Sequence, residues 1–295
     1  MRKRSKRTNS TDCRVCGGRN LVHRFRVRSQ DLWKCRDCGF QQVGVLPSAE
    51  IFAAIYSESY FTNAKYKGDL TALAKENKRR LTLLRDWIQP GANVLDAGCS
   101  TGDFIAHAKD EYKMYGIDYS EFAVSIARQR NPEIGSRIQS GGLEDATWSQ
   151  RPFDAICLWD VVEHIWNPTP VLSEMLQNVN SGGIIAISTP AIDSAMARVL
   201  GPYWPFMTPP EHLSFFSRKA FETCVRSLGN CDIVHFSRKG KWANLAFIAH
   251  KVCRIAPSWF PTFFLRPLLM WPLKNLSIYV PTGDIQYVII RKREA

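Results

Sequence analysis

The chain carries at residues 94–104 the stretch Val94-Leu95-Asp96-Ala97-Gly98-Cys99-Ser100-Thr101-Gly102-Asp103-Phe104. A short apolar strand leads here into a glycine-bearing turn, which lets bare backbone approach a ligand, and then into the N-terminus of a helix. A second strand ends at Asp118, 22 residues after Asp96. At this spacing a doubly wound sheet places a carboxylate against the ribose hydroxyls of a nucleoside. The segment therefore predicts a nucleoside site.

A second interpretation of the turn has to be weighed. Gly98-Cys99-Ser100-Thr101-Gly102 also fits the G-x-S-x-G pattern of a hydrolase nucleophile elbow. An elbow lies deep in a sheet that already has strands before it, and an acid and a histidine follow it. Here the turn follows the first strand of the sheet region, and residues 69–89 before it are helical and charged. The hydrolase interpretation is therefore disfavoured.

The turn also distinguishes two kinds of nucleoside site. A dinucleotide needs G-x-G-x-x-G to admit its pyrophosphate, and this chain has Gly98-Cys99-Ser100 instead. Asp96-x-Gly98-x-Ser100-x-Gly102 resembles motif I of class I S-adenosylmethionine-dependent methyltransferases, whose usual form is Asp/Glu-x-Gly-x-Gly-x-Gly. Ser100 replaces the middle glycine. Serine is small, so we expect the backbone of the turn still to come close to the cofactor. The property that the replacement of glycine by Ser100 affects is the affinity for the cofactor.

Later segments resemble the same family in the same order, and the resemblance covers about two thirds of the chain, from near Gly91 onward. Residues 141–145 resemble the adenine-contacting loop, 153–164 the fourth strand with motif IV, and 181–190 the fifth strand. Residues 211–217 resemble a loop of a subgroup related to ubiquinone-biosynthesis O-methyltransferases. The resemblance implies that S-adenosylmethionine is bound by ten residues: Asp96, Gly98, Ser100, Gly102, Asp118, Tyr119, Gly142, Leu143, Glu144 and Trp159.

The implied architecture is α/β, with a Rossmann-like seven-stranded, mostly parallel sheet whose last strand is antiparallel, plus a small N-terminal zinc ribbon. We expect the zinc ribbon at residues 1–46, a helical linker or lid at 47–90 and the methyltransferase domain at 91–295. A chain of 295 residues, 45% hydrophobic and 22% charged, can bury one large core plus a small module. The basic start of the chain is followed by no apolar run, so we expect no export and a cytoplasmic location.

Four of the nine cysteines have the spacing of a zinc ribbon: Cys13-x2-Cys16 and Cys35-x2-Cys38. Each pair presents two thiolates from a tight turn, so two such turns can close a tetrahedral site on one ion. A redox or disulfide pair is the alternative, which a chain without an export signal disfavours. With four protein ligands, the zinc would be structural and would have no open position for chemistry.

Positive charge is concentrated in this N-terminal module. Residues 1–40 hold 12 Lys and Arg against 3 Asp and Glu, a net charge of +9 out of +12 for the whole chain. With Phe25 and Trp33 between the charges, the ribbon is one candidate for a nucleic-acid or anionic-substrate patch. The alternative is that a small metal module simply carries solvated charge. Charge alone does not separate these two interpretations.

Catalytic candidates follow the predicted fourth strand. Methyl transfer needs an acceptor in line with the S-methyl bond, loss of its proton and exclusion of water. His164 or His212 would take the proton of an acceptor hydroxyl. The resemblance to quinone O-methyltransferases adds an acid-x-x-Glu-His cluster that can hold a divalent ion, matched here by Asp160, Glu163 and His164, which suggests Mg²⁺ or Mn²⁺. In the alternative interpretation Glu163 and His164 cap the following helix.

These features favour O-methylation of a small-molecule, glycan or lipid-linked acceptor. An RNA methyltransferase that binds nucleic acid through the basic ribbon is one alternative, although the chain lacks the Asn/Asp-Pro-Pro-aromatic motif of base N-methyltransferases at this position. A sugar C-methyltransferase is another. A non-catalytic zinc adaptor is disfavoured, because the acids of the nucleoside site and motif IV are present.

Two further segments carry hypotheses about substrates and surfaces. The Pro- and aromatic-rich residues 201–210 are expected to form a rigid wall of the acceptor site. Residues 256–276 are apolar and aromatic with two basic residues, which suits peripheral contact with a membrane, a lipid-linked substrate or a subunit interface. The prolines in this segment argue against a bilayer-spanning helix. Nothing in the sequence indicates the oligomeric state.

Overall fold

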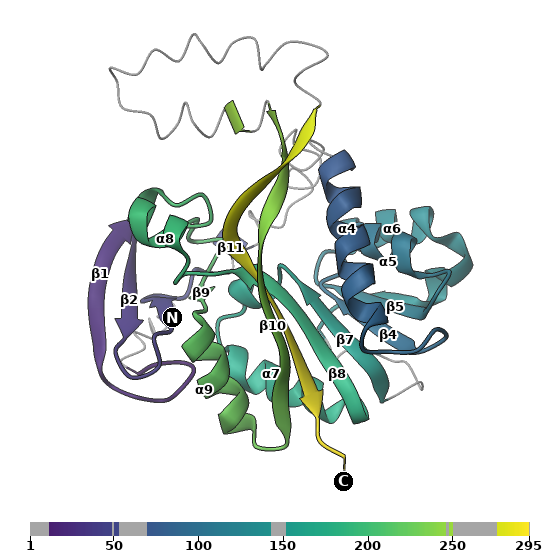
Figure 1. The fold of residues 1–295 in the computed structure, drawn as a ribbon, viewed down its shortest axis with the longest axis horizontal. Coiled ribbons are helices and arrows are strands. Elements are labelled where there is room, and N and C mark those ends of the chain that lie inside the picture. The colour runs from purple at the N-terminus through teal and green to yellow at the C-terminus, as the bar shows by residue number, and fades with distance from the viewer. Residues whose placement is uncertain are drawn as a thin grey trace, which may run out of the picture.

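The computed structural model describes residues 12–48, 50–52, 70–142, 152–245, 248–249 and 276–294. A seven-stranded sheet forms its centre, in the order β10-β11-β8-β7-β4-β5-β6 (Figure 1). β11 pairs antiparallel with both of its neighbours, and the pairs from β8 to β6 are parallel. The predicted Rossmann-like sheet is therefore confirmed. Its strands are β4 (Asn93–Ala97), β5 (Lys113–Asp118), β6 (Ile138–Ser140), β7 (Phe153–Trp159), β8 (Val179–Pro190), β10 (Cys231–Asn244) and β11 (Ser277–Lys292).

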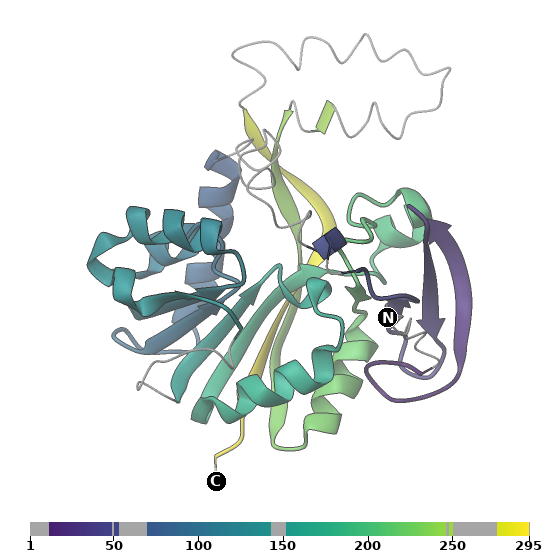
Figure 2. The same cartoon turned by 180° about the vertical axis from the view of Figure 1, so that it is seen from behind.

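Helices cover both faces of this sheet, because its strands carry buried apolar side chains on each side. One face packs against α4 (Leu70–Arg85), α5 (Asp103–Ala108) and α6 (Glu121–Arg130). The other face packs against α7 (Pro168–Gln177) and α9 (Arg218–Leu228). Figure 2 shows the same layers from behind. Short elements complete the chain: α8 (Ala195–Leu200), η1 (Pro132–Arg137), η3 (Val162–His164) and η4 (Gly201–Tyr203).

The N-terminal module and the methyltransferase-like part share a second sheet. β1 (Leu21–Val27), β2 (Gln30–Cys35) and β3 (Gln41–Val43) form an antiparallel meander, which continues into β9 (Ser214–Phe215). Gln41 pairs with Phe215 and Gln42 with Ser214. A strand from the C-terminal half thus completes the sheet of the ribbon, so the ribbon is anchored by backbone hydrogen bonds as well as by side chains.

A separate apolar core fills the space between the two sheets. Trp204 is its largest member and is 1% exposed; its indole N–H donates to Asp284 at 3.1 Å. The sequence predicted that residues 201–210 would form a wall of the acceptor site. Trp204 and Met207 of this loop are buried in the core that it shares with the ribbon, and the acceptor wall stays a prediction for the rest of the loop. The core consists of Leu32, Val43, Ile192, Ala197, Trp204, Met207, Leu213 and Phe215.

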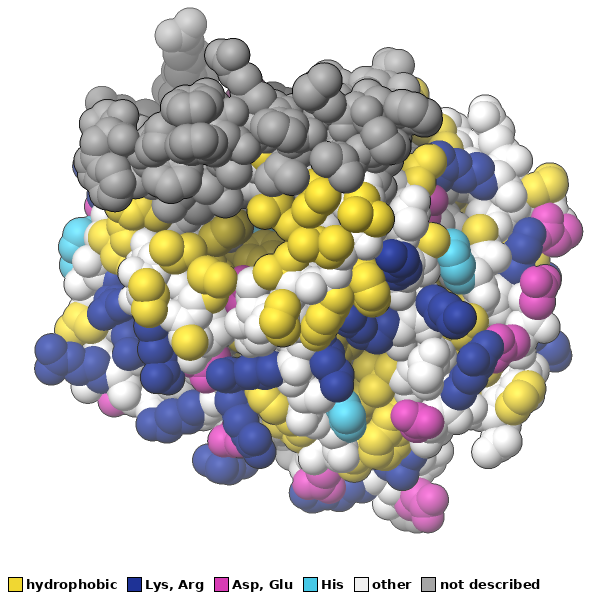
Figure 3. Space-filling model, turned by 45° about the horizontal axis from the view of Figure 1, so that its top comes forward, with side chains coloured by type: hydrophobic (Ala, Val, Ile, Leu, Met, Phe, Trp, Pro, Cys, Tyr) yellow, Lys and Arg dark blue, Asp and Glu magenta, His cyan; other side chains and the backbone are white. Residues whose placement is uncertain are grey.

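β10 and β11 continue beyond the sheet as a long two-stranded arm (Figures 1 and 2). Seen from that end, hydrophobic side chains gather beside the arm, with Lys and Arg near them (Figure 3). Leu276, Ile278 and Tyr279 are exposed there. Apart from Leu276, the segment with the proposed membrane or lipid contact lies outside the described residues. Among the helices of the described part, none is long and apolar enough to cross a membrane.

The turn after β4 has a left-handed backbone at three alternate positions. φ is +83° at Gly98, +49° at Ser100 and +75° at Gly102. A Cβ on Gly98 would lie 2.5 Å from Cγ2 of Val161, so this position admits only glycine without movement of its neighbour. Ser100 adopts the left-handed conformation with a side chain, at a cost on the order of 1 kcal/mol. The turn carries the chain across the carboxyl edge of the sheet.

We expect Gly98→Ala to destabilise the protein more than Gly91→Ala does. Gly91 has the same φ of +83°, and no described atom lies within 4 Å of a Cβ placed there. Its replacement therefore costs only the conformational strain, about 1 kcal/mol. At position 98 the added methyl also meets Val161, for a further loss of about 1–3 kcal/mol. Urea unfolding of both variants measures the difference, and equal losses would contradict the steric argument.

Candidate active site

Asp118 joins the end of β5 to the turn that follows β4. Its carboxylate accepts hydrogen bonds from the backbone N–H of Ser100 and of Ser120, each at 2.9 Å. Burial raises the pKa of Asp118, and these two hydrogen bonds oppose that rise. The acid and the turn that the sequence predicted as a pair are thus in direct contact. Tyr119, the next residue, is 76% exposed at the mouth of this site.

Asp96 lies beneath the same turn, at the end of β4. It is 3% exposed, and burial raises its pKa to about 7. The neighbouring Asp118 raises this pKa further, whereas the guanidinium of Arg80 lowers it. Two carboxyl groups, of Asp96 and Asp118, and the buried guanidinium of Arg80 therefore lie close together where the sequence predicts the nucleoside site.

The structure describes two of the four remaining predicted cofactor residues, Gly142 and Trp159. Gly142 follows β6 at the same edge of the sheet. Leu143 and Glu144 lie outside the described residues. Trp159, at the end of β7, is buried between Phe104 and Tyr287, with ring centroids 5.5 and 6.5 Å away. Its indole Nε1 is buried and has no hydrogen-bond partner among the described residues.

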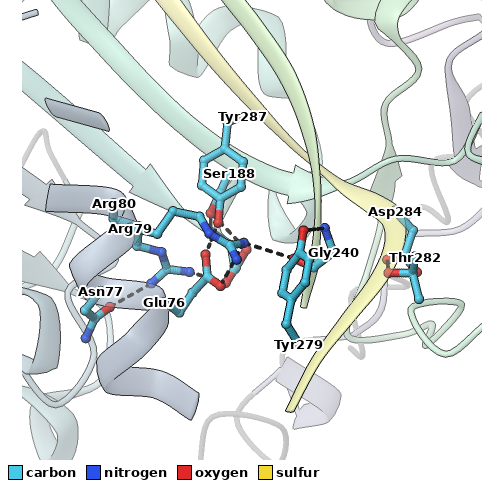
Figure 4. Close-up of polar contacts among 11 residues, drawn as sticks. Glu76, Asn77, Arg79, Arg80, Ser188, Gly240, Tyr279, Thr282, Asp284 and Tyr287 are labelled. Atoms are coloured by element: carbon cyan, nitrogen blue, oxygen red, sulfur yellow. Dashed lines mark hydrogen bonds and ion pairs between the residues drawn. The ribbon is translucent and has the colours of Figure 1, made fainter. Parts of the chain in front are cut away.

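Arg80 of α4 is a residue that the sequence analysis missed. It reaches across to the end of β7, where it forms an ion pair with Asp160 at 2.5 Å, and it lies 5.5 Å from the ring of Trp159. Asn77, one turn earlier, accepts a hydrogen bond from Arg80 at 3.2 Å (Figure 4). Both side chains are buried on the apolar face of α4. Polar residues at the positions where helical periodicity expects apolar ones were the signal that could have revealed them.

Asp160 is held in position by more than Arg80. Its φ is +57°, a strained conformation for this residue, and its Oδ1 accepts a hydrogen bond from the hydroxyl of Ser188 at 2.9 Å. Nearby, Glu76 accepts a hydrogen bond from the Tyr287 hydroxyl, which ties α4 to β11 (Figure 4). The sequence predicted Asp160 as a metal ligand, but in the structure its carboxylate is paired with the guanidinium of Arg80.

Glu163, His164 and His212 form a compact cluster. One ligand atom from each lies within 4.8 Å of the others. Glu163 is 2% exposed, accepts a hydrogen bond from Thr189 at 2.8 Å, and has its pKa raised to about 8, mainly by burial. Asp160, which the sequence grouped with these residues, is not a member. The structure therefore brings together three of the four predicted catalytic residues, with Asp160 beside them.

The two histidines of this cluster share one hydrogen-bonding arrangement. His164 Nδ1 lies 2.8 Å from the carbonyl oxygen of Glu211, and His212 Nδ1 lies 2.8 Å from that of Phe206. A carbonyl only accepts, so both Nδ1 atoms donate, and the lone pair of a neutral ring is on Nε2. Burial lowers the pKa of His164, which favours the neutral ring. The rings meet edge to face at 4.9 Å.

The four cysteines of the ribbon converge as their spacing predicted. All four sulfurs lie within 4.8 Å of one another, and the Cys13–Cys38 and Cys16–Cys35 pairs are 3.5 and 3.6 Å apart. These distances are too long for disulfides and close to the separation of about 3.8 Å that tetrahedral Zn–S bonds of ~2.3 Å require. The donor set therefore fits zinc. The thiols of Cys99, Cys157, Cys224 and Cys231 are buried away from this cluster.

Comparison with known proteins agrees with this geometry. A family model described as a methyltransferase domain matches residues 69–233. A protein of Mycolicibacterium smegmatis, named a probable S-adenosylmethionine-dependent methyltransferase, is 32% identical over 103 residues, which are 34% of this chain and 38% of that protein. The ubiquinone biosynthesis O-methyltransferase of Dechloromonas aromatica is 30% identical over 35% of this chain and 49% of its own length. The matched region thus spans half or less of each of these relatives.

Solved structures show the same fold. The magnesium protoporphyrin IX methyltransferase of Synechocystis, solved with S-adenosylhomocysteine bound, superposes with a TM-score of 0.54 at 15% identity. The match covers 84% of this chain and all of that one. Because the family model covers more than half of the sequence, the chain belongs to the family of S-adenosylmethionine-dependent methyltransferase domains.

Proposed function

We propose that the protein transfers a methyl group from S-adenosylmethionine to a hydroxyl of a small-molecule or glycan acceptor. The observation that carries this proposal is the Glu163–His164–His212 cluster beside Asp160, at the carboxyl edge of the sheet, in which Glu163 is buried and the two histidines are partly buried. It supplies neutral imidazole rings where an acceptor proton must leave. The ubiquinone biosynthesis O-methyltransferases among the relatives support an oxygen acceptor.

The residues at the edge of the sheet fit the cofactor. Asp118 is positioned to accept hydrogen bonds from ribose hydroxyls, and the turn at Gly98 presents bare backbone. The buried donors of Arg80, Asn77 and Trp159, each with a nitrogen that lacks an acceptor among the described residues, suit the carboxylate of the methionine part. When bound, the cofactor supplies an electrophilic methyl group on a positively charged sulfur.

Proton removal is the step that the protein side chains perform. Nε2 of His164 or of His212 accepts the proton of the acceptor hydroxyl, while each Nδ1–H remains bonded to its carbonyl oxygen. Burial raises the pKa of Glu163 to about 8, so at pH 7 this side chain is mainly a neutral carboxyl group and would stabilise the imidazolium as a dipole rather than as a full charge. Burial lowers the pKa of His164, which favours the neutral ring as the proton acceptor.

The same three residues could also hold a divalent cation. The sequence suggested Mg²⁺ or Mn²⁺ on three ligands, two of them carboxylates. Asp160 is paired with Arg80, so the cluster offers one carboxylate and two imidazoles. This donor set suits Mn²⁺, Fe²⁺ or Zn²⁺ better than Mg²⁺, which prefers oxygen ligands. A cation there would lower the pKa of a bound hydroxyl.

A structural zinc on Cys13, Cys16, Cys35 and Cys38 completes the proposed cofactors. The four sulfurs belong to two tight turns that pack against the main core, in which Phe40 and Phe216 lie with ring centroids 4.9 Å apart. A metal that closes both turns would fix the ribbon on the catalytic part. With all four positions filled by protein, this zinc takes no part in the chemistry.

Loss of the base is expected to reduce the rate without loss of the cofactor. The double variant His164→Asn/His212→Asn should lower kcat by about 10²–10⁴-fold, because neither amide can accept the proton. His107→Asn, on the exposed side of α5, is the control and should keep full activity. Transfer of a tritiated methyl group to glycan, lipid and RNA fractions measures both. Activity of the wild type on no fraction, or equal activity of the two variants, would contradict the proposal.

Cofactor binding is expected to depend on Asp118. Asp118→Ala removes the acceptor for ribose hydroxyls and the hydrogen bond to Ser100, so the Kd for S-adenosylhomocysteine should rise about tenfold or more. Asp110→Ala, at an exposed position eight residues earlier, should leave it unchanged. Calorimetric titration gives both constants. Binding by the Asp118 variant that equals the wild type would show that the site lies elsewhere.

Metal analysis is expected to find about one zinc per chain in the ribbon. Cys35→Ser removes one ligand and should release most of this zinc. The control Cys231→Ser changes a buried thiol outside the cluster and should retain it. Elemental analysis by mass spectrometry after gel filtration measures the ratio. A wild-type protein purified without chelator that holds iron or no metal would refute the zinc assignment.

A further inference from the structure

A basic cleft separates the ribbon from the catalytic part. It has a volume of about 320 Å³ and lies between β1 and β2 on one side and α8 and the start of α9 on the other. Four cationic side chains line it, two from each side: Arg24 and Lys34 of the ribbon, and Arg198 and Lys219 of the helices. Ile192 is one of the apolar residues that line the cleft. It follows β8, at the edge of the sheet that also carries Asp160.

These four cations lack carboxylate partners in the described part of the chain. The single acid that lines the cleft, Asp193, forms an ion pair with Arg238 at 2.6 Å and accepts a hydrogen bond from the backbone N–H of Arg218 at 3.3 Å. Its charge is therefore already balanced. Four like charges around one hollow repel each other, and an anion bound among them would relieve that repulsion.

The start of α9 adds to the positive potential. Ser217 caps this helix by accepting a hydrogen bond from Ala220 N–H at 3.1 Å, and the first turn contains no acid. Helix N-termini favour negative charge, and the Asp193 carboxylate supplies some of it here. Arg218 is paired with Glu222 at 2.9 Å, which leaves Lys219 as the cation of this first turn that has no carboxylate partner among the described residues. Gly39 of the ribbon lies close by, since a Cβ there would come within 3.0 Å of Ser217 Oγ.

We propose that this cleft binds a diphosphate group, as carried by a nucleotide-activated or lipid-linked sugar. Its cations are disposed on two opposite walls, which suits an anion with several oxygens on each side. The cavity has the volume of a small ligand site. The further statement that this diphosphate belongs to the methyl acceptor rests on the proposed function, whereas diphosphate binding itself does not.

The predicted zinc site gives the ribbon wall of the cleft its shape. Lys34 directly precedes Cys35, and Gly39 directly follows Cys38, so two lining residues flank the second pair of cysteines. An RNA backbone would instead need cations spaced along a surface for several nucleotides. Because four cations line a single cleft, they favour a compact anion such as diphosphate over an extended RNA backbone.

Titration with inorganic pyrophosphate and with uridine diphosphate tests the proposal on the full chain. The variant Arg24→Gln/Lys219→Gln removes one cation from each wall, and we expect its Kd for pyrophosphate to rise about tenfold or more. The control Arg36→Gln/Arg226→Gln removes the same charge from exposed positions of the ribbon and α9 outside the cleft. It should bind as the wild type does.

Three results would overturn the proposal. The first is no binding of pyrophosphate or uridine diphosphate by the wild type at millimolar concentration, and the second is equal weakening in both double variants. The third is tight, salt-sensitive binding of a 12-nucleotide oligouridylate that pyrophosphate does not displace, which would assign the surface to RNA. Binding of S-adenosylhomocysteine, measured in parallel, reports separately on the proposed function, because neither double variant touches the cofactor residues.

Discussion

The ion pair between Arg80 and Asp160 is the interaction on which the candidate active site depends. Arg80 is the common counter-charge of the buried acids around it, since it also lowers the pKa of Glu76, Asp96 and Glu163. Removing this buried cation would leave Asp160, whose side chain is 50% exposed, without its partner and would raise the pKa of Asp96 and Glu163 further. The helix that carries Arg80 is therefore an integral part of the candidate active site.

This balance of charge also suits the proposed cofactor. Burial raises the pKa of Asp96 and Glu163 because their charged forms lose solvation, and among the described residues Arg80 is the guanidinium that opposes this rise. A positively charged sulfonium would add a second cation to this surplus of acids, so it would be bound favourably. After methyl transfer the neutral product loses that attraction, which gives a physical reason for its release.

Local sequence features predicted the turn and its acid, but not the long-range contacts. Gly98, Gly102 and Asp118 follow from turn chemistry and chain spacing, and both histidines were found from motifs. Helical periodicity could mark Arg80 as a buried polar residue but not its partner, which is 80 positions away, and β9 is only two residues long and shows no periodicity. Asp160 was assigned to a metal because residues 160–164 match the acid-x-x-Glu-His cluster of quinone O-methyltransferases, whereas in the structure it has a left-handed backbone and is paired with Arg80 of α4.

Hydrogen bonds to backbone carbonyl oxygens connect the ribbon to the candidate active site. The net charge of the ribbon does not predict these contacts. Arg14, between the first two cysteines, donates to the carbonyl oxygens of Val43 and Leu213, each at 3.1 Å, and stacks 3.6 Å from the ring centroid of Trp166. The N–H of Leu213 donates to the carbonyl oxygen of Glu163 at 2.8 Å, and His212 is the preceding residue. A zinc that fixes Cys13 and Cys16 would thus also fix the loop that carries one of the two candidate bases.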